Sequence, residues 1–226
     1  MLNWDESQNW TKDEYKKAIA SAKAEKEPLV NLDTERASAE NERQLVRWAQ
    51  EDGYNAEIDT HRECVTVYLE KGGVYEVKGN LLTSGCDFIC HQVNCQGKMN
   101  SGIAKSIREK WPQVYEEYAF KCNGPKDKND PLLGSVQLVE TPDCTVINMF
   151  SQENYGYDGK RYTSYDAFWE CLQRIKFILG PKSKEKIGFP KNIGCCRGGA
   201  DWNVIKTMIE QVLGQDYNVY IYELEG

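Results

Sequence analysis

The chain has 226 residues, of which 40% are apolar and 28% charged, so it can form a packed core and lacks the composition of a disordered protein. Its 28 basic and 35 acidic residues give a net charge of −7, which argues against nonspecific adhesion to nucleic acid through the phosphate backbone. A small anionic ligand is still compatible with this charge, because backbone N–H groups and helix N-termini bind phosphate whatever the overall charge.

The first residues, "MLNWDESQNW", contain no basic segment followed by an apolar run, and the chain has no apolar stretch of about 18 residues. Nine cysteines, an odd number with Cys195 and Cys196 adjacent, favour reduced thiols over a disulfide framework. We therefore expect a soluble, cytoplasmic protein that does not interact with membranes, and we expect it to be a monomer.

Residues 1–72 are expected to form a small α/β extension. Residues 12–24 and 36–51 have helical spacing of apolar side chains, and "PLVNL", "NAEI" and "CVTVYL" are typical of short strands. The sequence "EKGG" at 70–73 then predicts a domain boundary. The role of the extension is unknown, and a protein or nucleic-acid partner for it is one interpretation.

Residues 73–226 alternate strands with helices, which predicts a mainly parallel sheet covered on both faces, with ligands at the carboxyl ends of the strands. Strands are expected over 74–78, 87–94, 135–140, 144–149, 186–190 and 217–223. Helices are expected over 102–111, 164–179 and 202–213, with a further helix that follows the first of these and ends near Cys122.

Two glycine-bearing turns follow predicted strands: "NCQGKMNSG" and "NIGCCRGGAD". Glycine permits a positive φ and leaves room for successive N–H groups to converge on an anion at the start of the next helix. The alternative is that these glycines only make tight turns between a strand and a helix.

Three separated segments carry a family resemblance: "VYEVKGNLL", "FICHQVNCQGKMNSGIAKSIREKWP" and "IGFPKNIGCCRGGADWNVIKTMIEQVL", followed by "NVYIYEL". They resemble the macrodomain family of ADP-ribose-binding modules over about residues 74–226. The similarity is greatest to the branch with terminal ADP-ribose protein glycohydrolase, DNA ADP-ribosyl glycohydrolase antitoxins and enzymes that process ADP-ribose-1''-phosphate. The resemblance implies a three-layer α/β/α sandwich that binds ADP-ribose or an ADP-ribosylated substrate without a cofactor or metal.

The resemblance also implies which residues contact the ligand. The first loop would lie near the distal ribose and diphosphate, the second loop would bind the diphosphate, and the residues after "VKG" would lie near adenine. The implied ligand-binding residues are Asn80, Leu81, Asn94, Met99, Ser101, Gly102, Ile103, Ala104, Tyr155, Gly194, Cys195, Cys196, Arg197, Gly198 and Gly199.

Several positions depart from the family pattern or have a structural alternative. Asn80 stands where many macrodomains carry an aspartate that accepts from the adenine amino group, and it could instead close the turn. Asn94 would face the distal ribose, or its side chain could cap its own turn. Cys196 replaces an expected glycine, and Arg197 adds a fork-shaped partner for phosphate or is simply solvated.

Catalysis in this branch is attributed to an acid in the second loop, for which Asp201 is the candidate here, with Asn94 holding the ribose. Asp201 also immediately precedes a helix, so it could be only an N-cap. A lysine that traps the ribose in one relative has no clear counterpart, since Gln152 and Glu153 stand near the expected position and Lys160 comes later.

Other chemistries are less favoured. Neither histidine can be placed beside Cys195 and Cys196, which argues against a cysteine nucleophile. The group Cys86, Cys90, His91 and Cys95 contains no C-x₂-C pair, so no metal site is expected. We expect hydrolysis of an ADP-ribose derivative, such as an ADP-ribosyl linkage or ADP-ribose-1''-phosphate. A non-catalytic protein that reads or sequesters such nucleotides is the alternative.

Overall fold

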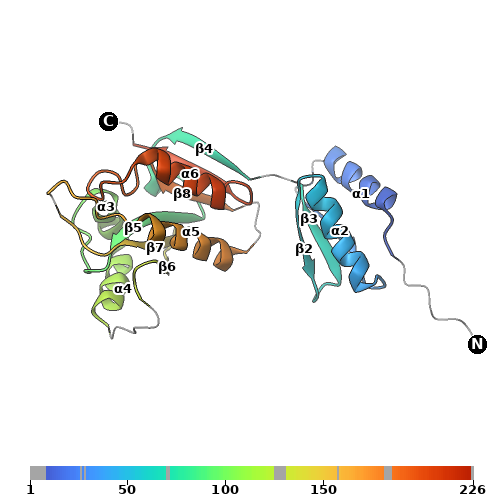
Figure 1. Cartoon of the computed structure of the whole chain (residues 1–226), viewed down its shortest axis with the longest axis horizontal. Helices are drawn as coiled ribbons and strands as arrows, with labels where there is room; N and C mark the ends of the chain where they lie inside the picture. Colours follow the sequence, from blue (N-terminus) through green and yellow to red (C-terminus); the bar gives the residue numbers. More distant parts are fainter. Residues whose placement is uncertain are drawn as a thin grey trace, which may run out of the picture. The chain divides into compact units, whose positions relative to one another are not determined.

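The computed structural model describes residues 9–25, 27, 29–69, 72–124, 131–156, 158–180 and 185–224. The chain divides into two compact units, Met1–Lys71 and Gly72–Gly226, which are described separately (Figure 1). None of the described helices combines the length and the apolar composition that crossing a bilayer requires.

The smaller unit packs two helices on an antiparallel sheet. Its elements are α1 (Lys12–Ala24), β1 (Leu29–Asp33), α2 (Ala39–Glu51), β2 (Asn55–Asp59) and β3 (Cys64–Tyr68), with strand order β1-β3-β2. Helix α2 begins three residues later than predicted, because Ser38 is extended and its hydroxyl accepts a hydrogen bond from the N–H of Asn41 (3.2 Å).

The core of the smaller unit lies between its helices and one face of the sheet. Tyr15 of α1 is fully buried, and its ring lies 5.9 Å from that of Trp48 of α2. The same buried cluster includes Leu32 of β1, Leu45 of α2 and Val65 of β3. This unit therefore has an apolar core of its own.

The larger unit is a three-layer α/β/α structure, as predicted. Its strands are β4 (Gly73–Lys78), β5 (Phe88–Asn94), β6 (Val136–Glu140), β7 (Thr145–Gln152), β8 (Lys186–Pro190) and β9 (Asn218–Glu223). Its helices are η1 (Leu81–Thr83), α3 (Gly102–Lys110), α4 (Pro112–Asn123), α5 (Tyr165–Leu179) and α6 (Trp202–Val212). The sheet has the order β4-β9-β8-β5-β7-β6 and is parallel except for β6, which pairs antiparallel with β7.

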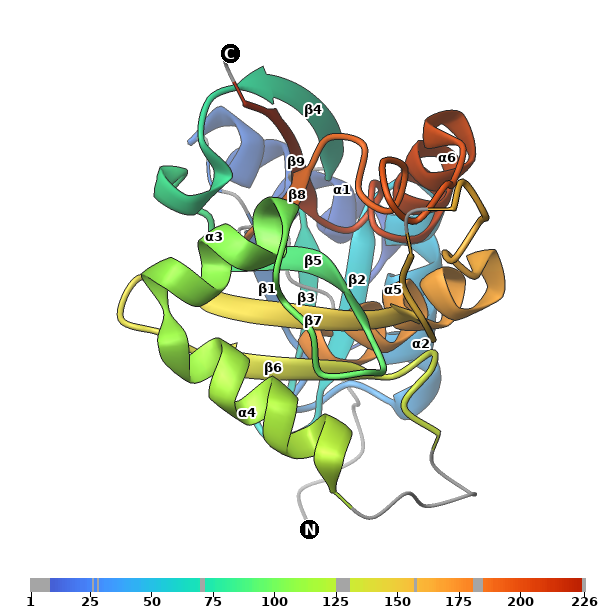
Figure 2. The same cartoon turned by 90° about the vertical axis from the view of Figure 1, so that its left-hand side faces the viewer.

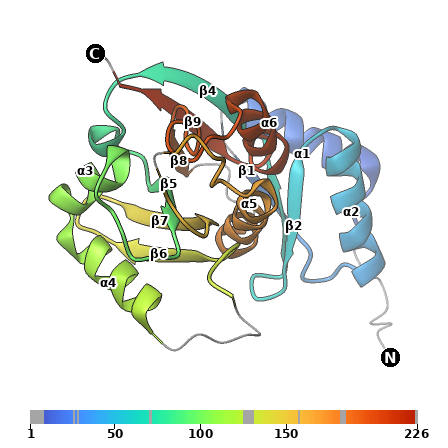
Figure 3. The same ribbon diagram turned by 60° about the vertical axis from the view of Figure 1, so that its left-hand side comes forward.

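Helices α3 and α4 cover one face of the sheet, and α5 and α6 cover the other (Figures 2 and 3). The two faces enclose separate buried clusters. Ile107 and Val114 pack against Val93 and Phe150 on one side, and Phe168 and Ile205 pack with Met149 on the other. Burial of both faces explains why the central strands read as nearly continuous apolar runs.

The parallel arrangement places the carboxyl ends of β4, β5, β7, β8 and β9 at one edge of the sheet. Both glycine-bearing turns leave from this edge, at residues 95–101 after β5 and 191–200 after β8. The segment 153–164 after β7 leaves from the same edge, as do Gly79 and Asn80 after β4. The fold therefore brings the predicted ligand-binding segments to one end of the sheet.

Candidate ligand-binding site

The turn after β5 is organised by the side chain of Asn94, which is 6% exposed. Its Oδ1 accepts hydrogen bonds from the N–H groups of Gln96 (2.9 Å) and Lys98 (3.3 Å), and its Nδ2 donates to the carbonyl of Lys98 (2.8 Å). These are the hydrogen bonds of the capping alternative for Asn94. Gly97 within the turn has a φ of 69°, which favours glycine.

The hydroxyl of Tyr118 of α4 forms hydrogen bonds with the backbone of this turn. Its hydroxyl donates to the carbonyl oxygen of Asn94 (2.7 Å) and accepts from the N–H of Lys98 (3.1 Å). The side chain is fully buried, and burial raises the pKa of its hydroxyl above the usual tyrosine value. Tyr118 was not predicted as a site residue, because a tyrosine on the buried face of a helix gives no sign in the sequence that it reaches a strand end.

The turn leads to the N-terminus of α3, which has no side-chain cap. Met99 is buried beneath it, Ser101 is extended and makes no capping hydrogen bond, and the first helical turn contains no acidic residue. Gly102 has a φ of 54°, and a Cβ at this position would meet no atom within 4 Å. The first N–H groups of α3, from Gly102 through Ile103 to Ala104, are therefore available to an anion.

The loop after β8 is tightly folded on itself. Gly199 donates its N–H to the carbonyl of Cys195, and Ala200 donates to that of Gly194, both at 3.1 Å. Cys196 and Arg197 are exposed. Among the described residues, the backbone N–H groups of Cys196 and Gly198 form no hydrogen bond. The loop thus presents a second set of donors at the same edge of the sheet.

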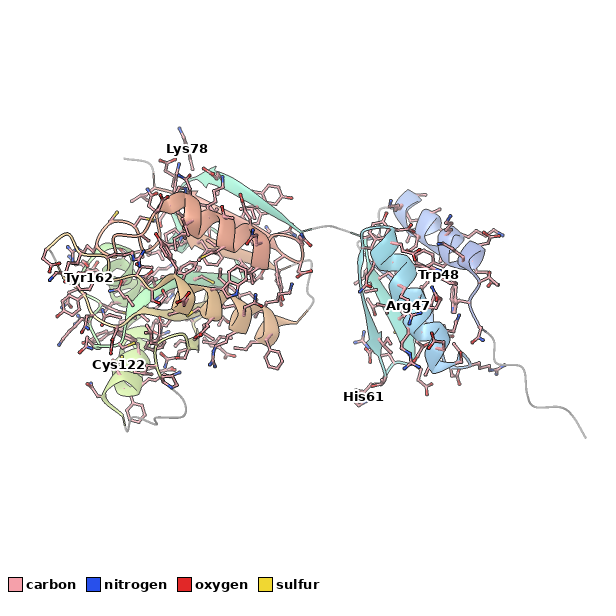
Figure 4. The ribbon with its side chains drawn as sticks, in the orientation of Figure 1. Arg47, Trp48, His61, Lys78, Cys122 and Tyr162 are labelled. Carbon is pink, nitrogen blue, oxygen red and sulfur yellow. The ribbon has the colours of Figure 1, made fainter. Side chains whose placement is uncertain are left out.

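The segment after β7 runs along this loop. Tyr162, labelled in Figure 4, and Thr163 both donate their N–H groups to the carbonyl of Gly198 at 2.9 Å. Arg161 stacks on the ring of Tyr165, 4.7 Å from its centroid. Tyr155 is 45% exposed on the same segment. Tyr157, in the same segment of the sequence, lies outside the described residues.

Asn80 lies at the start of η1. Its Oδ1 accepts a hydrogen bond from the N–H of Leu82 (2.9 Å), so the side chain closes the turn after Gly79. Leu81 is buried beside β8, where a Cβ on Gly188 would come within 2.5 Å of its Cδ1. Leu81 therefore helps to fix η1 against the sheet.

Asp201 is the N-cap of α6. Its Oδ1 accepts a hydrogen bond from the N–H of Asn203 (2.8 Å), and its own N–H donates to the hydroxyl of Tyr165 (2.8 Å). These are the contacts of the capping alternative. The cap also joins the start of α6 to the start of α5, beside the glycine loop.

The cysteines and the buried histidine make other contacts. Burial raises the pKa of Cys195 to about 11, and its Sγ donates to the carbonyl of Ile193 (3.4 Å), so this thiol is a poor nucleophile. His91 is fully buried, with its Nε2 and the Oδ1 of Asn148 2.5 Å apart. Within the described part of the chain, no three His, Cys, Asp or Glu side chains are grouped as metal ligands would be.

A parallel α/β sheet with glycine loops and an open helix N-terminus at its carboxyl edge has the arrangement of a nucleotide-binding protein. Solved structures define the class more closely. The macrodomain of Thermus aquaticus DarG superposes with a TM-score of 0.54 at 22% identity, over 67% of this chain and 99% of that chain. A Bacteroides thetaiotaomicron protein of unknown function gives a TM-score of 0.57 at 26% identity over 67% and 98%. Thermosipho africanus DarTG in complex with ADP-ribose gives 0.54 at 15% over 90% and 71%.

Curated proteins with similar sequences also come from ADP-ribose biochemistry. DNA ADP-ribosyl glycohydrolases of Mycobacterium tuberculosis and Thermus aquaticus are 24% and 20% identical to this chain over 154 and 153 residues, or 66% and 65% of it. The chain spans about two fifths of the length of these relatives, and no family model matches it. The larger unit has the macrodomain fold.

Proposed function

We propose that the macrodomain binds ADP-ribose with its diphosphate between the N-terminus of α3 and the loop 194–199. The observation that carries this proposal is the uncapped first turn of α3, which contains no acidic residue and in which Gly102 is open to solvent. The N–H groups of Cys196 and Gly198 supply further donors from the neighbouring strand end. The ADP-ribose complex of Thermosipho africanus DarTG, which shares this fold, supports the choice of nucleotide.

For the activity, we propose hydrolysis of an ADP-ribosyl linkage, with ADP-ribosylated DNA as the first substrate to test. The names of the curated relatives support this choice. In this proposal the two loops fix the diphosphate while water attacks the anomeric carbon and the bond from that carbon to the DNA breaks. Asp201 accepts a proton from the water and returns it to the departing DNA group. ADP-ribose-1''-phosphate is the second substrate to test, with a phosphate as the leaving group.

One observation favours the alternative of a non-catalytic ADP-ribose reader. The side chains of Asn94 and Asp201, the two residues expected to take part in chemistry, are both committed to backbone hydrogen bonds that hold a turn and a helix cap. A reader needs these residues only as supports, whereas a hydrolase needs at least one of them to reach the ribose.

A product assay separates the two functions. The chain is incubated with ADP-ribosylated DNA, ADP-ribosylated protein, ADP-ribose-1''-phosphate and O-acetyl-ADP-ribose, and released ADP-ribose is measured by chromatography. Calorimetry with ADP-ribose is run on the same preparation. Binding with turnover supports the hydrolase, and binding without turnover on all four substrates supports the reader. Absence of binding at millimolar ADP-ribose contradicts both.

For the smaller unit, a protein partner is the better proposal. Residues 1–71 contain 16 acidic and 10 basic residues, a net charge of −6, so almost all of the negative charge of the chain lies there. Such a charge repels a phosphate backbone, which makes nucleic acid a poor partner for this unit. A pull-down with residues 1–71 as bait tests this choice. Recovery of a specific protein supports it, and recovery of bound nucleic acid, identified by sequencing, contradicts it.

A further inference from the structure

Thr163 lies between the loop after β8 and the strands that carry the site, and the proposed function gives it no role. Thr163 forms an isolated antiparallel β-bridge with Gln152, the last residue of β7. It immediately precedes Ser164, the N-cap of α5. Its side chain is 2% exposed. A buried hydroxyl in a loop segment must find hydrogen-bond partners, so its partners show what it holds.

The hydroxyl of Thr163 connects β5 to the glycine loop. Its Oγ1 donates to the carbonyl of Gly194 (2.9 Å) and accepts from Nε2 of Gln92 (2.9 Å). The same Nε2 donates to Oε1 of Gln152, at the end of β7. One hydroxyl therefore ties the strand ends of β5 and β7 to the first residue of the glycine loop.

The backbone of Thr163 holds the far side of the same loop, because its N–H donates to the carbonyl of Gly198 (2.9 Å). The hydroxyl also occupies the space into which side chains at the two glycines would project. A Cβ on Gly198 would come within 2.2 Å of Oγ1, and a Cβ on Gly194 would come within 3.0 Å. Other atoms also leave no room for these side chains, since a Cβ on Gly194 would lie 2.5 Å from Oε1 of Gln92 and one on Gly198 would lie 2.3 Å from the carbonyl oxygen of Gly194. The tight packing around Thr163 therefore requires glycine at both positions.

We infer that Thr163 is a positioning residue for the diphosphate loop. This inference rests on the proposed function. Thr163 fixes the carbonyl groups of Gly194 and Gly198 by hydrogen bonds, so that the loop presents the N–H groups of Cys196 and Gly198 in one arrangement. A donor set that is already ordered loses less conformational entropy when it binds an anion. Thr163 itself does not contact the ligand.

Thr163→Val tests this role, since valine keeps the shape and removes the hydroxyl. We expect ADP-ribose binding by calorimetry at 15 °C to weaken at least about tenfold. Thr163→Ser, which keeps the hydroxyl, should bind within about threefold of wild type. Thr207→Val is the matched control, because Thr207 Oγ1 also donates to a carbonyl, that of Asn203 (2.8 Å), on the exposed face of α6. This control should leave affinity unchanged.

A purely structural role would lower the melting temperature of Thr163→Val without changing the affinity of the folded protein. That result, or equal weakening by Thr163→Ser, would overturn the inference. If Thr163→Val does not fold, the pair Thr163→Ala and Thr163→Ser is compared in the same way.

Amide hydrogen exchange of residues 196–199 in the ligand-free protein provides a second test that does not need ADP-ribose. We expect faster exchange in Thr163→Val than in wild type and Thr207→Val, and equal exchange would contradict the inference. If wild type does not bind ADP-ribose, the proposed function fails, and the exchange experiment still decides whether Thr163 orders the loop.

Discussion

The hydroxyl of Tyr118 donates to the carbonyl oxygen of Asn94 across 2.7 Å and lies 2.9 Å from the Oδ1 of the same residue. A helix residue thereby fixes the end of β5, where the turn toward α3 begins. Removal of the phenol hydroxyl takes this donor from the carbonyl oxygen of Asn94, whereas Oδ1 keeps the N–H groups of Gln96 and Lys98.

Tyr118→Phe should therefore weaken ADP-ribose binding and lower the free energy of unfolding by about 1–3 kcal/mol. Tyr115→Phe, one turn earlier on α4 and with its ring 6.4 Å from that of Tyr118, is the control and should change neither quantity. Calorimetry and urea unfolding measure the two effects. Equal behaviour of the two variants would show that the hydroxyl of Tyr118 is not needed by the turn.

Asp201 allows capping to be separated from proton transfer. Asparagine caps helices about as well as aspartate, so Asp201→Asn should unfold at the same urea concentration as wild type, and Asp201→Ala should lose about 1 kcal/mol. If the hydrolase proposal holds with Asp201 as the acid, Asp201→Asn also loses about 10²–10⁴-fold in rate. Full turnover by Asp201→Asn would leave Asp201 with the cap alone.

His91 should make stability depend on pH. Burial lowers its pKa to about 4 in the folded state, against about 6.5 when unfolded. Between these values the unfolded chain binds more protons, so the free energy of unfolding falls as the pH falls from about 6.5 to about 4, by at most about 3 kcal/mol. Urea unfolding at pH 7, 5.5 and 4.5 measures the slope.

His91→Gln removes the titrating ring and should flatten this slope over the same range. His61→Gln, in the exposed turn before β3, is the control and should keep the slope of wild type. An identical slope in His91→Gln and wild type would mean that other groups cause the acid sensitivity.

Two glycine substitutions that appear equivalent in the sequence should behave differently. Gly102→Val places its side chain in open space at the start of α3, so we expect loss of ADP-ribose binding with a stability cost of about 1–2 kcal/mol from the positive φ. A Cβ on Gly199 would lie 3.1 Å from the Cα of Arg161 and from the carbonyl oxygen of Lys160. Gly199→Val should therefore displace the loop and destabilise the protein more.

Calorimetry and thermal unfolding of the two variants check this difference. The two glycines have different surroundings, so only Gly102→Val is expected to lose binding while the fold stays largely intact. Normal binding by Gly102→Val would place the diphosphate away from α3.

The larger unit should bind ADP-ribose without the smaller one. Residues 72–226 contain both loops and all the hydrogen bonds that organise them. A fragment of residues 72–226 is expected to bind with the same Kd as the full chain by calorimetry. A folded fragment, verified by circular dichroism, that fails to bind would show that residues 1–71 contribute to the site.

Much of the fold was predictable because strands and helices leave local patterns. Residues 12–24 and 186–190 were predicted with the bounds that α1 and β8 have. The antiparallel direction of β6 was not predicted, because alternation of side chains carries no information on strand direction. The three-residue helix η1 was also missed, since a single turn leaves no periodic signal.

For the site, the sequence located both glycine turns and left two interpretations open for Asn94 and Asp201. The hydrogen bonds of the capping interpretation are local, and the structure shows them for both residues. Contact of either residue with a ligand stays a prediction. Thr163 and Tyr118 are different, because their partners Gly194 and Asn94 lie 31 and 24 residues away in the chain. Such pairings depend on the packed sheet and leave no trace in local sequence.

The exposure of Cys196 gives the site a chemical handle. The other eight cysteines are buried or partly buried, and the raised pKa of neighbouring Cys195 keeps that thiol protonated at neutral pH. A maleimide reagent should thus react first with Cys196, in the loop that carries the free donors. A fluorophore attached there would report the arrival of an anion directly, and a bulky adduct would block its entry, without any substitution in the chain.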